Sequence, residues 1–295
     1  MKRAAVILVI MSMAVLAAMA QSTGQPAQQN PPAGQATTPG ATTSGATAVP
    51  AVKRPPQLKT KPEQDAYNAA AAITDAAAIE KAADDFATKF PDSEVRVLLY
   101  KNAMRDYQNA NNAEKTEAMG RKVLALDPDD PEALAVVAEV ITERTRDTDI
   151  DRDQRYAEAT TMAKRAVQTV DTDLAMQAGT PQDKIDAAKG YIRSQAYSII
   201  GTIEYKKENY VAAQEDLQKS IDAYPSDPDP VVVLRVALAL DKQEKYAEAL
   251  KFANRAVELT QDNTPIGTPA RHERDRLQQL TPGATPAQPQ TPPKN

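Results

Sequence analysis

Prolines divide the central part of the chain into short segments, and this punctuation limits what the chain can fold into. Pro91, Pro128, Pro131, Pro225 and Pro230 each stand between runs in which apolar residues recur at i, i+3, i+4 and i+7. That spacing places apolar side chains on one face of a helix, and a proline ends a helix or begins one. No run alternates apolar and polar residues over a useful strand length. The sequence therefore predicts an all-α fold of short helices.

Two threonine–proline pairs predict further helix starts. Thr180 and Thr268 are suited to cap a helix, and Pro181 and Pro269 would follow at the first helical position, where a missing N–H breaks no hydrogen bond. The stretch from Pro181 to about Lys207 is predicted to form one long helix.

The helices come in pairs that share an internal pattern, which is clearest in residues 194–227. Its key positions are Tyr197, Ile200, Gly201, Tyr210, Ala213, Leu217, Ser220, Ile221 and Pro225. This 34-residue pattern resembles the tetratricopeptide repeat, in which small residues let two antiparallel helices approach closely and a final proline turns the chain into the next unit. Weaker copies of the pattern occupy about residues 62–92, 97–128, 131–171 and 230–261.

The resemblance implies a right-handed α-solenoid of about five tetratricopeptide-like helix pairs in residues 58–280, closed by a capping helix at 268–280. Three departures from the family pattern stand out. No unit has the family's tryptophan, unit 3 carries about nine extra residues near 144–152, and residues 172–193 form an extra connection before unit 4.

The same resemblance implies that the first helix of each unit lines a concave face, with its second, fifth, ninth and twelfth residues free to touch a partner. We therefore predict a protein- or peptide-binding surface, and no cofactor or metal. Its candidate residues are Lys101, Arg105, Gln108, Glu139, Ser198, Thr202, Tyr205, Val231, Leu234 and Leu238.

Two groups of these candidates suggest particular contacts. Lys101 and Arg105, at i and i+4, are placed to grip a carboxylate together; the alternative is two solvated charges on an exposed face. Val231, Leu234 and Leu238 form an apolar stripe that suits a partner helix or an extended peptide, unless another part of the chain covers it.

The extra residues of unit 3 contain the spacing of a calcium loop. Asp147, Asp149, Asp151, Asp153 and Glu158 occupy places 1, 3, 5, 7 and 12 of such a loop. However, arginine stands at place 6, where the tight turn normally needs glycine, and four nearby arginines repel a cation and compete for the aspartates. A solvated charged loop is the favoured interpretation.

Catalysis finds no support in the sequence. The chain has no cysteine and a single histidine, His272, which sits among charged residues of the expected capping helix. No glycine-rich phosphate loop, GxSxG motif or paired histidines are present. An acidic chain of net charge −5 without a basic tract also argues against nucleic acid as a partner.

The two ends of the chain predict export and flexible tethers. Residues 1–20 combine Lys2 and Arg3, an apolar run and a small-residue cleavage pattern, as a signal peptide does. The alternative is an uncleaved anchor, but the apolar run is short for a span of about 20 residues. Residues 21–57 and 281–295 are rich in Pro, Gln, Thr and Ala and predict a disordered linker and tail.

These patterns predict an exported, non-enzymatic binding scaffold of a bacterial cell envelope, periplasmic or secreted, without a stable membrane anchor once the signal is cleaved. The alternative is a self-associating structural or assembly factor of an envelope complex.

Overall fold

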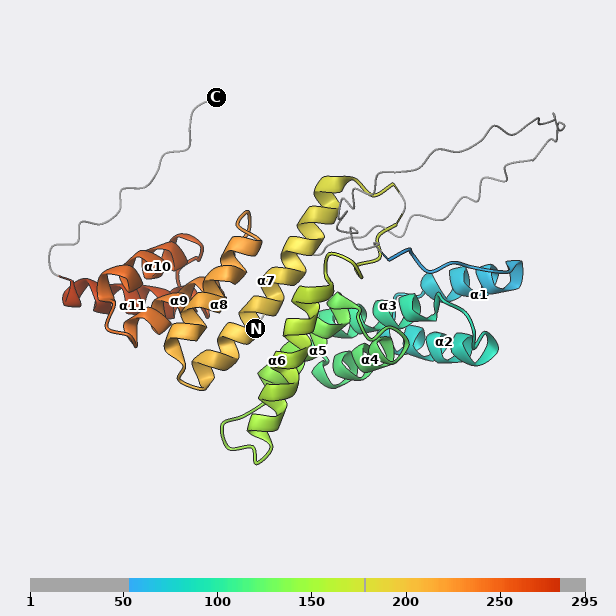
Figure 1. Cartoon of the computed structure of the whole chain (residues 1–295), viewed down its shortest axis with the longest axis horizontal. Helices are drawn as coiled ribbons and strands as arrows, with labels where there is room; N and C mark the ends of the chain where they lie inside the picture. The colour runs from blue at the N-terminus through green and yellow to red at the C-terminus, as the bar shows by residue number, and fades with distance from the viewer. Residues whose placement is uncertain (1–52, 178, 282–295) are drawn as a thin grey trace, which may run out of the picture. The chain divides into compact units, whose positions relative to one another are not determined.

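A computed structural model describes residues 53–177 and 179–281. The expected signal peptide, residues 21–52 of the expected linker and residues 282–295 of the tail lie outside the described residues. The described chain forms eleven α-helices and no strand, which confirms the all-α prediction (Figure 1). The helices are α1 Lys61–Ala71, α2 Ala76–Lys89, α3 Arg96–Asn109, α4 Ala113–Leu126, α5 Pro131–Arg144, α6 Arg152–Thr169, α7 Gln182–Lys206, α8 Tyr210–Ala223, α9 Pro230–Asp241, α10 Tyr246–Glu258 and α11 Gly267–Leu280.

Each helix packs against the next one along the chain, as expected of a solenoid. The pairs α3–α4, α5–α6, α7–α8 and α9–α10 are the tightest neighbours within units, and α11 packs on α10. Three apolar clusters fill the spaces between them. Their largest fully buried members include Leu99, Met104, Tyr156, Leu240 and Leu277.

Three of the turns between paired helices share one backbone geometry. Asn111, Glu208 and Glu244 all have φ between 55° and 64°, in the left-handed region. In each turn the next N–H donates to a carbonyl five residues back, for example from Asn112 to Tyr107 at 2.9 Å. This is the Schellman geometry that ends a helix in a left-handed residue. The three residues occupy the same repeat position in units 2, 4 and 5, so the sequence repeat is also a repeat of backbone conformation.

Close approach of α7 and α8 depends on two glycines of α7, and a Cβ on the first, Gly190, would lie 2.7 Å from the carbonyl oxygen of Ala223 of α8. A Cβ on Gly201 of α7 would lie 2.9 Å from the backbone nitrogen of Leu217 and 3.1 Å from the carbonyl oxygen of Ala213, both on α8. These are backbone atoms, which cannot move aside without separating the helices. Gly190 and Gly201 therefore set the spacing of α7 and α8 together.

Two helix starts differ from the predictions. The long helix α7 begins at Gln182 with Pro181 at the cap position, and the Thr180 hydroxyl donates to the Gln177 carbonyl at 2.8 Å instead of capping α7. Helix α11 begins at Gly267, because the Thr264 hydroxyl accepts the Gly267 N–H at 2.9 Å and starts the helix upstream of Thr268.

The array begins with an extended segment. Residues 53–59, which we name the N-terminal strap, precede α1 and lie against the array. The sequence predicts that residues 53–57 belong to the disordered linker, but charged residues begin at Lys53, and Lys53 and Arg54 bind the array. Helix α1 then starts at a capping box, in which Thr60 and Glu63 satisfy each other's backbone N–H groups.

Candidate functional site

The predicted partner-binding residues lie on the first helices of the units, which are joined to one another by polar side chains. We call α3, α5, α7, α9 and α11 the odd-helix row. At each joint a side chain of one odd helix contacts the next odd helix or the segment that caps it.

The α3–α5 joint is a cluster of four ionised side chains. Lys101 Nζ lies 2.7 Å from Asp130 Oδ2 and 3.0 Å from Glu132 Oε2. Arg105 donates through Nε and Nη2 to the two oxygens of Glu132, at 2.5 and 2.6 Å. The Lys101 and Asp130 side chains are only 10% and 7% exposed. Two cations thus face two carboxylates in a nearly closed site.

The cluster shifts the titration of its members. Burial acts to raise the pKa of Glu132, but Lys101 and Arg105 outweigh it and hold that pKa well below its usual range. Burial likewise acts to lower the pKa of Lys101, and Glu132 and Asp130 reverse this and raise it. Each of these two groups is therefore charged at neutral pH because its neighbours are charged.

The next joints use weaker polar contacts. Between α5 and α7, Gln195 Nε2 donates to Glu139 Oε2 at 2.7 Å, and Lys206 Nζ donates to the Thr142 carbonyl at 3.1 Å. Between α7 and α9, Arg235 Nη1 donates to the Thr202 hydroxyl at 3.0 Å.

The last joint closes the row at the capping helix. Arg276 of α11 pairs with Asp241 of α9 at 2.5 Å and with Glu273 of its own helix at 2.9 Å. Every joint from α3 to α11 therefore carries at least one hydrogen bond or ion pair.

Several candidates are therefore not free, contrary to the expectation. Lys101 and Arg105 do grip a carboxylate together, but it belongs to Glu132 of the chain's own next unit; they are not solvated charges either. Thr202 and Leu234 are buried, at 8% and 6% exposed: Thr202 accepts a hydrogen bond from Arg235 of α9, and Leu234 lies in the apolar cluster of α8 to α11.

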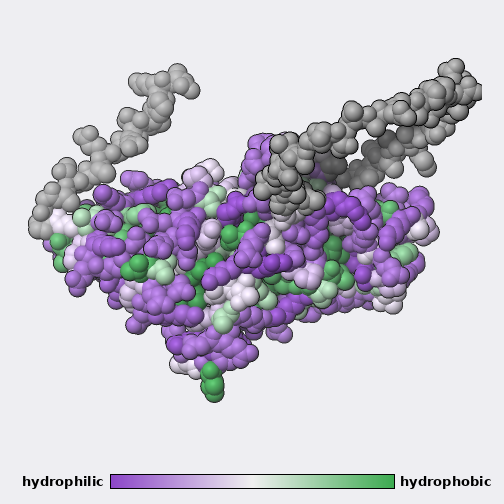
Figure 2. Space-filling model, viewed as in Figure 1, coloured by the Kyte–Doolittle hydropathy of each residue, from purple (hydrophilic) through white to green (hydrophobic). Residues whose placement is uncertain are grey.

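Other candidates keep access to solvent. Gln108 is exposed at the end of α3, and Ser198, Tyr205, Val231 and Leu238 are partly exposed. Tyr205 stacks edge-on against Tyr210 with ring centroids 5.4 Å apart, and burial raises the pKa of its hydroxyl. The accessible candidates thus concentrate on α7 and α9, beside Arg235. The face drawn in Figure 2 is mostly hydrophilic, with apolar residues in small separate groups.

Three of the four aspartates of the unit 3 loop are engaged with neighbouring groups. Asp149 accepts the Arg146 N–H at 2.9 Å, Arg155 pairs with Asp151 at 2.8 Å, and Arg152 with Asp153 at 3.1 Å. Glu158 lies within α6 and binds Arg121 of α4, at 2.8 Å. Among the residues that the structure describes, no three acidic, histidine or cysteine side chains are grouped to hold a metal ion.

Two further features are simple to place. His272 is exposed on α11. Within residues 53–177 and 179–281, no helix combines the length and the apolar character needed to cross a bilayer.

No family model matches the sequence, and no curated protein matches it significantly. Solved structures of similar fold include the MamA protein, at 18% identity over 62% of this chain and 80% of MamA, with a TM-score of 0.43. A thermophilic TPR protein of Thermus thermophilus, TTC0263, is 12% identical over 72% of this chain and 98% of its own, with a TM-score of 0.45. PilF of Pseudomonas aeruginosa is 18% identical over 64% of this chain and 93% of its own, with a TM-score of 0.31.

Proposed function

We propose that this chain is an exported, non-catalytic scaffold that binds a protein or peptide in a bacterial cell envelope. One observation carries the proposal: polar contacts fix the odd helices to one another at every joint from α3 to α11. A surface whose parts are already ordered loses little conformational entropy when a partner binds. Such a surface suits recognition and needs no chemistry of its own.

The contact region would be the accessible part of α7 and α9. Tyr205 and Leu238 offer partly exposed apolar area, and Arg235 lies beside Thr202 between them in the row. Apolar and aromatic groups next to an arginine are the composition typical of binding hot spots. We expect the partner to lay a helix or an extended segment along this region.

Photo-crosslinking in cells that express the chain natively tests the proposal. A photoreactive residue would be placed at Ser198 or Leu238 on the odd helices, and at Lys164 of α6 or Lys251 of α10 as matched exposed controls. We expect one discrete adduct from the first two positions and none from the controls. Equal adducts from all four positions would remove the odd-helix row as the binding surface.

A substitution sharpens the same test. Leu238→Asp should abolish the adduct from Ser198, whereas Lys251→Asp should leave it unchanged, with circular dichroism showing both variants folded. An adduct of twice the chain's own mass would instead favour the alternative, a self-associating assembly factor.

Export is tested separately. We expect the mature protein to begin at Gln21 and to fractionate with the periplasm or the medium. An intact N-terminus in the membrane fraction would favour an uncleaved anchor.

A further inference from the structure

The N-terminal strap binds the array as an extended ligand would. The Lys53 N–H donates to the Thr172 carbonyl, just beyond α6, at 2.7 Å. Lys53 Nζ pairs with Asp127, at the end of α4, and lies 3.9 Å from Asp173 Oδ1. One residue of the strap therefore contacts two separate segments of the array through its backbone and its side chain.

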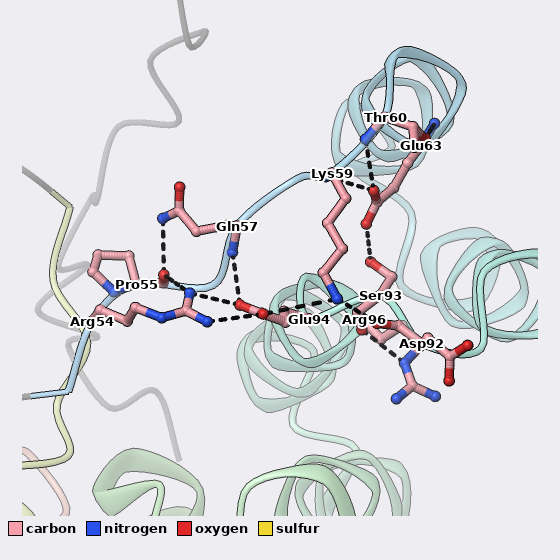
Figure 3. A network of polar contacts seen from close by, with 10 residues as sticks. All are labelled: Arg54, Pro55, Gln57, Lys59, Thr60, Glu63, Asp92, Ser93, Glu94 and Arg96. Atoms are coloured by element: carbon pink, nitrogen blue, oxygen red, sulfur yellow. Dashed lines mark hydrogen bonds and ion pairs between the residues drawn. The ribbon is translucent and has the colours of Figure 1, made fainter.

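The next residue makes a two-pronged contact (Figure 3). Arg54 Nη1 and Nη2 donate to the two oxygens of Glu94, at 2.7 and 2.9 Å, and the Gln57 N–H donates to Glu94 Oε2 at 3.2 Å. Glu94 lies just before α3. The hydrogen bond from Arg54 and that from the Gln57 backbone lower the pKa of Glu94 to about 2. Glu94 therefore stays ionised across the physiological range.

The remaining strap residues fit the same binding mode. Pro55 and Pro56 are half-buried, and Leu58 packs against the apolar cluster of α1 to α5. Prolines hold a chain extended and reduce the entropy lost when it is bound. The array thus binds two basic side chains, two prolines and one apolar side chain in succession.

The groups that receive the strap come from three parts of the array. We call Glu94, Asp127 and Asp173 the acidic edge. They lie before α3, after α4 and after α6, and carboxylates so spaced match consecutive basic residues of an extended chain. The strap itself is the evidence that this edge takes a ligand.

We propose that the acidic edge is a second binding site, specific for an extended segment of another protein in which two basic residues precede prolines, and that the strap fills this site in cis. The inference goes beyond the odd-helix row. The contact of Arg54 with Glu94 is open to solvent, with the Arg54 side chain 65% exposed, and the Lys53 side chain is still 33% exposed against Asp127, so these ion pairs are weak. A competing segment of the same chemistry has to overcome only these contacts and the high effective concentration of the tethered strap.

A fluorescent peptide with the sequence of residues 53–60 tests the site. It would be titrated into the full chain, into Lys53→Ala/Arg54→Ala, and into the control Lys61→Ala, whose lysine pairs with Asp65 on α1. Loss of the cis contacts should tighten peptide binding by about tenfold or more, and Lys61→Ala should behave as the wild type. Adding Glu94→Gln and Asp127→Asn to the strap variant should abolish binding.

Three results would overturn the proposal. They are no peptide binding to the strap variant, binding that survives Glu94→Gln with Asp127→Asn, and equal binding of a peptide with both basic residues replaced by glutamate. A dimer of the strap variant that Glu94→Gln dissolves would make a second copy, rather than another protein, the occupant. Leu238→Asp should leave peptide binding intact, so this test is independent of the odd-helix row.

Discussion

The joint between α3 and α5 and the joint between α7 and α9 occupy the same place in two successive pairs of units, but they are built from different chemistry. Both second helices start at an Asp–Pro pair whose aspartate caps the helix: Asp130 accepts the Ala133 N–H at 2.9 Å, and Asp229 accepts the Val231 N–H at 2.8 Å. Asp130 is buried against Lys101, whereas Asp229 is exposed.

The positions around the two aspartates explain the difference. Where the first joint has Lys101, Arg105 and Glu132, the second has Ser198, Thr202 and Val231. The first joint therefore holds three ion pairs in a largely buried site, and the second uses a hydroxyl and apolar side chains. One repeat geometry therefore accommodates either an ionic joint or a joint of hydroxyl and apolar groups. We expect the ionic joint to lose more stability when a single partner is removed, because that leaves a buried charge unpaired.

The largest expected difference in stability is between variants that lack one or the other of the two capping aspartates. Asp130→Ala removes a helix cap and leaves Lys101 without its closest counter-ion, so the free energy of unfolding should fall by about 3–5 kcal/mol. Asp229→Ala removes only an exposed cap and should cost about 1 kcal/mol. Urea unfolding followed by circular dichroism measures both, and equal losses would contradict the distinction drawn between the joints.

The second prediction concerns pH. Because the pKa of Glu132 is lowered in the folded state, its contribution is fully present above the unfolded value of about 4.5 and is lost as pH falls towards the folded value. Glu132→Gln should therefore cost about 2–4 kcal/mol at pH 7 and progressively less below pH 4.5. A difference between wild type and variant that stays constant from pH 7 to pH 3 would refute the assignment.

A third, smaller effect tests packing beside the second joint. Gly201→Ala should lower the free energy of unfolding by about 1–2 kcal/mol, since the added Cβ meets backbone atoms of α8 and this outweighs the better helix propensity of alanine. Ser198→Ala, on the same helix and partly exposed, is the control and should change stability by less than about 0.5 kcal/mol. Stabilisation by Gly201→Ala would show that α7 and α8 can separate at no cost.

The smallest effect lies in the second joint itself. Thr202→Val removes the acceptor of the Arg235 hydrogen bond at similar volume and should cost about 0.5–1 kcal/mol. The same urea experiment measures it. A loss as large as that of Asp130→Ala would mean that the two joints contribute equally to the free energy of unfolding.

Helix pairing could be predicted from sequence because it depends on local periodicity. Ile200, Leu217 and Ile221 stand at key positions of the repeat pattern in residues 194–227, and all three are buried. The contacts that the candidate site residues make within the chain could not be predicted in the same way. Lys101 meets Asp130 across 29 residues, and the charge of a side chain does not reveal which neighbouring unit it faces. The repeat length does predict where the next unit starts. The acidic residues at that start were therefore the available candidates for the partner of Lys101.

The strap shows a second kind of limit. Its basic residues set it apart from the uncharged linker before it, but its prolines predict an extended chain whether it is bound or free. Only the partners Glu94 and Asp127, 40 and 74 residues away, distinguish the two states. Contacts of this range leave no local signal.

The docked strap also decides how the molecule responds to tension. Tension on the chain ahead of Lys53 acts on the contacts of Lys53 with the Thr172 carbonyl and Asp127 before it acts on α1. The strap is held by partly exposed ion pairs, so we expect it to detach before the buried clusters of α1 to α5 unfold. Residues 53–59 would therefore detach first under force. Their release would lengthen the chain while the helical units stay folded.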